Sequence, residues 1–171
     1  MENPLGDPTK YPIKVNPAKA FFVHTITRDI ELQDAILDLL DNCVDGVSRF
    51  IKANPHLEES ETPYNNFSAT ITLNDNYFKI EDDCGGIPEE LAKGYAFRMG
   101  RPDVPTDTGV NSIGMYGIGM KRALFKMGQD ISVKSQHKKY AFELSINREW
   151  LQSDTDWDLY LTEIHFCPVS P

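Results

Sequence analysis

Carboxylates and one amide recur along a single segment at the spacing of an α-helix. Asp38, Asp41 and Asp45 lie three and four positions apart, and Asn42 directly follows the second of them. At about 100° per residue, these side chains fall on one side of a helix. The apolar residues of the segment fall on the other side. The pattern therefore predicts a strongly amphipathic helix over 29–51.

The acidic side of this predicted helix carries like charges at helical spacing. Asp34 and Asp38 are four positions apart, as are Asp41 and Asp45, and no lysine lies between them. Like charges at this spacing destabilise a helix slightly, so a positive group over this side would explain the pattern. Carboxylate and amide oxygens are ligands of Mg²⁺, which also binds substrate phosphates. The acidic side therefore indicates either a Mg²⁺ site or an ordinary solvated helix face.

A second candidate lies where a predicted strand ends in a carboxylate. Asp82 closes the strand expected over 77–82, and Gly85 and Gly86 follow in a turn. A carboxylate in this position can accept a hydrogen bond from an exocyclic amine. The glycines allow a flat base to lie close to the backbone. The alternative is a plain strand-to-helix turn in which Asp82 only caps the next helix.

A third candidate is a glycine motif that leads into a helix. Gly114, Gly117 and Gly119 precede a predicted helix that begins with Lys121 and Arg122. Free backbone N–H groups and the helix dipole make such a helix start a binding place for anions. The motif is not a P-loop, because a methionine separates the last glycine from the lysine and no hydroxyl residue follows. A flexible loop before a basic helix start is the alternative.

These three signals must be brought together by the elements between them. In chain order the sequence predicts a helix, two strands, a helix, a glycine-rich loop, a helix and three strands. This order indicates an α+β fold, a two-layer sandwich with helices on one face of a mostly antiparallel sheet. The segment 1–17 is expected to be an extended arm before one domain over 18–171, and 18–27 fits a short strand or the entry to a helix. The predicted strands are 68–73, 77–82, 130–135, 139–146 and 159–167, and the shorter helices begin at Pro88 and Met120.

Composition limits the classes of function. The chain has 171 residues and a net charge of −9, which argues against non-specific binding of nucleic acid. No apolar run approaches the length of a membrane span, so we expect no membrane association. The three cysteines are odd in number and lack C-x-x-C spacing, which favours a reducing, cytoplasmic location over a disulfide framework or a zinc site.

Taken together and in order, these motifs resemble the GHKL superfamily, which includes gyrase B subunits, ninety-kilodalton heat-shock chaperones, sensor histidine kinases, MutL and the MORC proteins. The segment DLLDNCVD from Asp38 to Asp45 resembles the helix motif of that family. The segment DDCGG from Asp82 resembles its adenine-binding turn, and IGMYGIGMK, ending at Lys121, resembles its phosphate-binding glycine motif. The residues of this glycine motif are most similar to those of the MORC and chaperone branches. The segment LTEI around Thr162 resembles a late strand of the family.

The resemblance implies a Bergerat-type domain that binds ATP and Mg²⁺. By analogy, Asp82 would accept the adenine amino group, Asn42 would bind Mg²⁺, and Asp38 would activate the attacking water. The further ATP-binding residues that the resemblance implies are Asp45, Gly86, Ile87, Gly114, Tyr116, Gly117, Ile118, Gly119, Met120, Lys121 and Thr162.

Three departures from the family pattern affect the expected activity. Asp38 is one methylene shorter than the glutamate common in hydrolysing branches, and Cys84 stands where the first turn glycine is expected. Leu161 stands where a glycine often precedes the threonine. In related proteins a lysine from a following domain contacts the terminal phosphate. We therefore expect slow hydrolysis by this chain alone, with the missing cation supplied by a homodimer partner or by a further C-terminal domain.

Three functions remain open on the sequence alone. The first is an ATP-binding module with slow ATP hydrolysis, working within a larger or oligomeric machine. The second is a non-hydrolysing ATP switch, in which nucleotide orders the segment 100–119 and drives dimerisation or recruits a partner. The third is an acidic interaction domain that binds no nucleotide.

Overall fold

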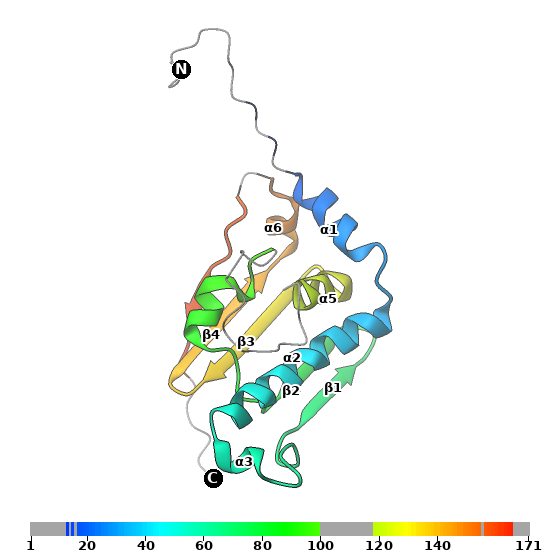
Figure 1. Ribbon diagram of the computed structural model, residues 1–171. Helices are drawn as coiled ribbons and strands as arrows, with labels where there is room; N and C mark the ends of the chain where they lie inside the picture. Colours follow the sequence, from blue (N-terminus) through cyan, green and yellow to red (C-terminus); the bar gives the residue numbers. More distant parts are fainter. Residues whose placement is uncertain (1–12, 14, 16, 100–117, 155, 166–171) are drawn as a thin grey trace, which may run out of the picture.

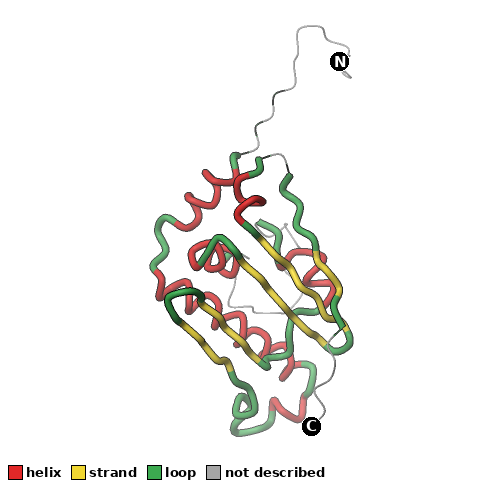
Figure 2. Tube along the Cα trace, turned by 180° about the vertical axis from the view of Figure 1, so that it is seen from behind, coloured by secondary structure: helices red, strands yellow, loops and turns green. Residues whose placement is uncertain are grey.

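The computed structural model describes residues 13, 15, 17–99, 118–154 and 156–165. Helices form one layer and strands the other. In Figure 1, α2 and α5 lie in front of the strands; in Figure 2, which shows the molecule from behind, the strands lie in front of the helices. This arrangement confirms the predicted α+β sandwich. The helices are α1 (Lys19–Thr27), α2 (Leu32–Lys52), α3 (Pro55–Glu58), α4 (Glu89–Leu91) with the π-helical turn η1 (Ala92–Ala96), α5 (Gly119–Met127) and α6 (Arg148–Gln152).

All strand pairing in the described residues is antiparallel. One sheet is the hairpin β1 (Ala69–Leu73) and β2 (Phe78–Asp82), and the other has the order β3-β4-β5. The Asn74 side chain accepts hydrogen bonds from the backbone N–H groups of Asn76 and Tyr77, which fixes the predicted hairpin turn. The strands of the second sheet are β3 (Ile131–His137), β4 (Tyr140–Ile146) and β5 (Leu161–Glu163).

The long helix α2 buries one narrow stripe of its surface. Five of its buried residues repeat at intervals of four, and they pack on α5, the hairpin, the turn after β2 and α3; they are Ala35, Leu39, Cys43, Val47 and Ile51. Val44 and Phe50, which the helical pattern places on the apolar side, are 40% and 42% exposed. The buried stripe is therefore narrower than the apolar side that the sequence pattern predicts. Phe50 instead packs edge-to-face on Phe67, with ring centroids 5.5 Å apart.

The largest group of buried side chains lies under β4. Phe142, Leu144 and Ile146 are at most 3% exposed and pack against Phe125 of α5. Burial of side chains this large contributes about 1.5–3 kcal/mol each. This cluster fixes α5, and with it the start of that helix, on the sheet.

The sequence left two possibilities for the segment 18–27, a short strand or the entry to a helix. In the structure this segment forms helix α1. Its Lys19 is fully buried; its Nζ donates to the carbonyl of Trp150 at 2.8 Å and lies 4.0 Å from the centre of that ring. Helix α6, which carries Trp150, was not predicted, because five residues are too few to show a helical period. Asn147 caps its start by accepting from the Trp150 N–H.

The predicted arm over 1–17 lies outside the described residues, except for residues 13, 15 and 17. Among the described helices, none has the length and apolar content that crossing a lipid bilayer requires.

Candidate functional site

A cavity of about 550 Å³ lies between α2, the hairpin, α5 and β3. Its volume is in the range of small-molecule sites, about 300–1,000 Å³. Five residues selected from the sequence line it, namely Asn42, Asp82, Gly86, Ile87 and Met120. Apolar side chains from the same elements complete much of the wall, including Leu39, Phe78, Ile80, Leu124, Met127, Ile131 and Val133.

The turn after β2 is held tightly between α2 and β3. Gly86 has φ of +65°, in the left-handed region that favours glycine, and a Cβ there would overlap the carbonyl of Gln136. On the other side, a Cβ on Gly46 would lie only 2.5 Å from the carbonyl oxygen of Cys84. The Ile87 N–H donates to Ser135 Oγ at 2.8 Å. These close approaches fix the backbone that forms one end of the cavity.

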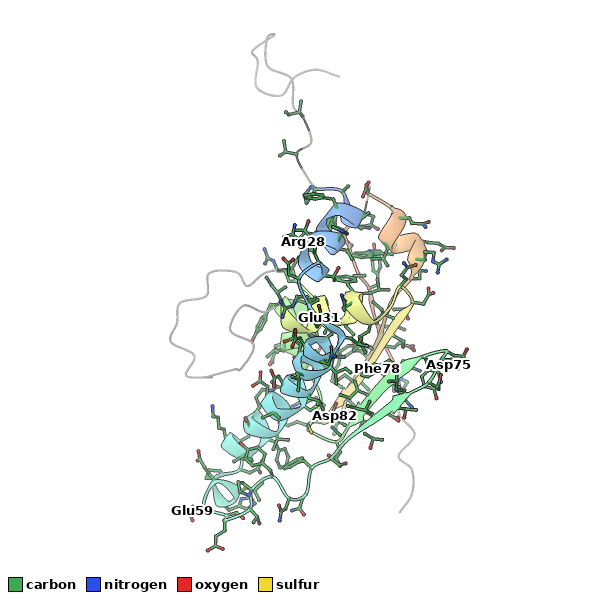
Figure 3. The ribbon with its side chains drawn as sticks, turned by 90° about the vertical axis from the view of Figure 1, so that its right-hand side faces the viewer. Arg28, Glu31, Glu59, Asp75, Phe78 and Asp82 are labelled. Carbon is green, nitrogen blue, oxygen red and sulfur yellow. The ribbon has the colours of Figure 1, made fainter. Side chains whose placement is uncertain are left out.

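Asp82 stands at the end of β2, on the side of the hairpin nearest α2 (Figure 3). Its Oδ1 accepts the Cys84 N–H at 2.9 Å. Two thiols lie close to this carboxylate. Burial, followed by the charge of Asp82, raises the pKa of Cys43 to about 12 and that of Cys84 to about 11. Both thiols are therefore protonated near pH 7, and they act here as small apolar parts of the wall.

Asn42 reaches the cavity from α2. Its Nδ2 donates to the backbone carbonyl of Asp38, which leaves the amide oxygen as an acceptor. The described residues hold no cluster of three or more acidic, histidine or cysteine side chains that could bind a metal ion. A single amide oxygen still fits Mg²⁺, because this ion commonly takes one or two protein oxygens and completes its shell with water and with the phosphates of a bound substrate.

Asp38 lies one turn before Asn42 and contacts the start of α5. Its Oδ2 is 3.0 Å from Arg122 Nη2, and its side chain is 23% exposed. A Cβ built on Gly119 would be 3.4 Å from Asp38 Cγ, so the first residue of α5 lies directly beside the carboxylate. The like charges on the acidic side of α2 suggested a positive group close to them. At Asp38, that positive group is Arg122 of the same chain.

Other predicted site residues lie away from the cavity wall. Lys121 is 5% exposed, and its Nζ donates to the carbonyl of Ala96 at 2.9 Å. Burial lowers its pKa to about 8. Thr162 is on β5, two strands from β3, and pairs with Glu143. The lining does not include Asp38, Lys121, Thr162 or Asp45.

The structure describes the second half of the glycine motif. Gly119 is the first residue of α5, and Ile118 is the residue before it. Neither Ile118 nor Gly119 is part of the cavity wall. Gly114, Tyr116 and Gly117 lie outside the described residues.

A family model described as histidine kinase-, DNA gyrase B-, and HSP90-like ATPase matches residues 30–169. The chain belongs to this family. The match covers α2, the cavity and all five described strands, and it confirms the GHKL resemblance. Membership of this ATPase family implies that the domain binds ATP. No curated protein matches the chain. The resemblance to the MORC and chaperone branches stays a prediction.

Sequence reasoning missed several contacts of the candidate site. The pairing of Asp38 with Arg122 joins residues 84 positions apart. The anchors of the turn on β3, Ser135 and His137, are also distant in sequence; His137 Nδ1 lies 2.7 Å from the Gly85 carbonyl oxygen. Of these residues, only Arg122 could have been selected as a site residue from its local sequence, because it follows the glycine motif directly.

Proposed function

We propose that this domain binds ATP together with Mg²⁺ in the cavity and hydrolyses the terminal phosphate slowly. The observation that carries the proposal is the convergence of three groups. Asp82 and Asn42 line one cavity, and the start of α5 lies against Asp38, one helical turn from Asn42. In this arrangement Asp82 would bind the adenine base, Asn42 would bind Mg²⁺, and the start of α5 would bind the phosphates.

The cavity wall suits a purine. Asp82 uses Oδ1 for the Cys84 N–H, and a carboxylate has further lone pairs that can accept the adenine amino group. The side chains of Leu39, Ile80 and Met120 offer apolar surfaces for the two faces of a flat ring. At this end of the cavity, Gly86 lets the turn after Asp82 pack directly against the backbone of β3.

The phosphates would extend toward the start of α5. This nine-residue helix begins at Gly119, and its first N–H groups have no partner within the helix. Asn42 would supply the oxygen ligand for Mg²⁺, which when bound neutralises charge on the phosphates. Asp38 would accept the proton of the water that attacks the γ-phosphorus, while the bond to the β-phosphate oxygen breaks and ADP leaves.

A second candidate function is a non-hydrolysing ATP switch. The ion pair of Asp38 with Arg122 favours it, because a carboxylate held by an arginine is less available to accept a proton. In that case bound ATP would drive dimerisation or recruit a partner. Both functions share the ATP site and differ only in the fate of the terminal phosphate.

Calorimetric titration with ATP and Mg²⁺ tests the ATP site. We expect Asp82→Asn to weaken binding by about tenfold or more, because a hydrogen bond to a charged group contributes about 1.5–3 kcal/mol. Asp83→Asn is a matched control, since the Asp83 carboxylate bonds to Ser68 and does not line the cavity. Equal ATP affinity of Asp82→Asn and the wild type would contradict the proposal.

Phosphate release separates the two functions. Hydrolysis by the proposed route predicts that Asp38→Asn binds ATP but releases phosphate at least tenfold more slowly than the wild type. Asp34→Asn, one turn earlier on the same side of α2, should release phosphate at the wild-type rate. ATP-dependent dimerisation without phosphate release from any of these proteins would establish the switch instead.

A further inference from the structure

Arg122 has more hydrogen-bonding capacity than its contacts use. Its Nη2 donates to Asp38 Oδ2 at 3.0 Å, and its side chain is 39% exposed. Its Nε is buried and has no hydrogen-bond partner among the described residues. A guanidinium carries five N–H donors in a planar fork. The single carboxylate contact therefore leaves a donor of this cation unsatisfied inside the protein.

The position of Arg122 matters as much as its chemistry. It lies in the first turn of α5, three residues after Gly119. A Cβ at the position of Gly119 would be in van der Waals contact with the Asp38 carboxylate. Arg122, Asp38 and the helix start thus occupy one small region. A phosphate placed close enough to Asp38 for water activation also comes within reach of the Arg122 guanidinium, which already contacts Asp38.

We infer that Arg122 exchanges Asp38 for the terminal phosphate when ATP binds. The inference rests on the proposed function and names the cation of that site. Without ATP, Arg122 holds the carboxylate of Asp38. With ATP, the guanidinium moves to the γ-phosphate, whose several oxygens and higher charge can engage more of its donors than one carboxylate does. Asp38 is then free to accept a proton from water.

The exchange makes Arg122 a sensor of the third phosphate. ADP lacks the γ-phosphate, so the pair of Arg122 with Asp38 stays closed when ADP binds. ATP must break this partly exposed ion pair, and an arginine contact to phosphate offsets that loss. The alternative is a purely structural pair that joins α2 to α5 and does not distinguish ATP from ADP.

The test compares ATP and ADP affinities by calorimetry in the presence of Mg²⁺. We expect Arg122→Gln to weaken ATP binding about tenfold or more and to change ADP binding less than twofold. We expect Asp38→Asn to strengthen ATP binding about threefold, because ATP no longer competes with the carboxylate, and to leave ADP binding unchanged. Lys126→Gln removes a cation from the same helix one turn later and should change neither affinity.

Several results would overturn the exchange. Equal losses of ATP and ADP affinity in Arg122→Gln would show a structural pair, and so would no loss of either. Weaker ATP binding by Asp38→Asn would also contradict it, and this variant leaves Arg122 in place should Arg122→Gln fail to fold. Arg122→Lys keeps the charge and should retain part of the preference for ATP. Failure of the wild type to bind either nucleotide would instead refute the ATP site itself.

Discussion

Replacing Gly46 by alanine would press a methyl group of α2 against the turn that follows Asp82. In an ordinary helix interior this change is stabilising by about 0.8–1 kcal/mol. Here the new Cβ would lie 2.5 Å from the carbonyl oxygen of Cys84 and 3.3 Å from its carbonyl carbon. A backbone oxygen cannot rotate away as a side chain can, so overpacking should cost about 2–3 kcal/mol. The net expectation is a loss of about 1–2 kcal/mol in the free energy of unfolding.

Urea denaturation of the wild type and Gly46→Ala measures this loss directly, and the melting temperature should fall by roughly 2–8 °C for a chain of this size. Gly94→Ala is the matched control, because a Cβ at Gly94 meets no atom within 4 Å. It should be neutral or slightly stabilising. A Gly46→Ala protein as stable as the wild type, or more stable, would refute the close packing of α2 on the turn.

Three further predictions concern the same region. Gly86→Ala should lower the free energy of unfolding by about 3 kcal/mol, seen by urea denaturation, because it adds left-handed backbone strain to an overlap with β3. At pH 8 iodoacetamide should modify Cys84 in the native protein roughly a hundredfold, and Cys43 roughly a thousandfold, more slowly than an unperturbed thiol, because burial raises their pKa values to about 11 and about 12; modification at the unperturbed rate, followed by mass spectrometry, would contradict this. Burial lowers the pKa of Lys121 from 10.5 to about 8, so the native protein loses this proton at a lower pH than the unfolded chain does. The free energy of unfolding should therefore increase as the pH rises from about 8 to 10.5. Lys121→Met should lack that gain in urea denaturation at pH 7, 8.5 and 10, and an equal pH dependence of the two proteins would contradict it.

Local patterns predicted much of the fold. The β1–β2 hairpin follows from β-rich segments on either side of Asn74, whose side chain bonds to its own turn. The predicted helix over 29–51 agrees with α2 because periodicity over many residues is a strong signal. These features depend on interactions between residues close in sequence, which one sequence can reveal.

Contacts between distant segments could not be predicted in the same way. Nothing in the pattern around Asp38 shows that Arg122 lies opposite it, because the packing of α2 on α5 decides that contact. The orientation of Lys121 follows from the same packing: the glycine motif suggested a phosphate contact, whereas its Nζ bonds to the Ala96 carbonyl inside the protein. The exposure of Val44 similarly reflects how little of α2 its neighbours cover.

We propose that one cavity between α2, β2, β3 and α5 holds ATP, and a crystal structure of the protein with ATP and Mg²⁺ would decide this. In that structure we expect the adenine amino group on the carboxylate of Asp82, with the phosphates directed toward Asn42 and the start of α5. Nucleotide bound elsewhere on the protein, with water alone in this cavity, would contradict it.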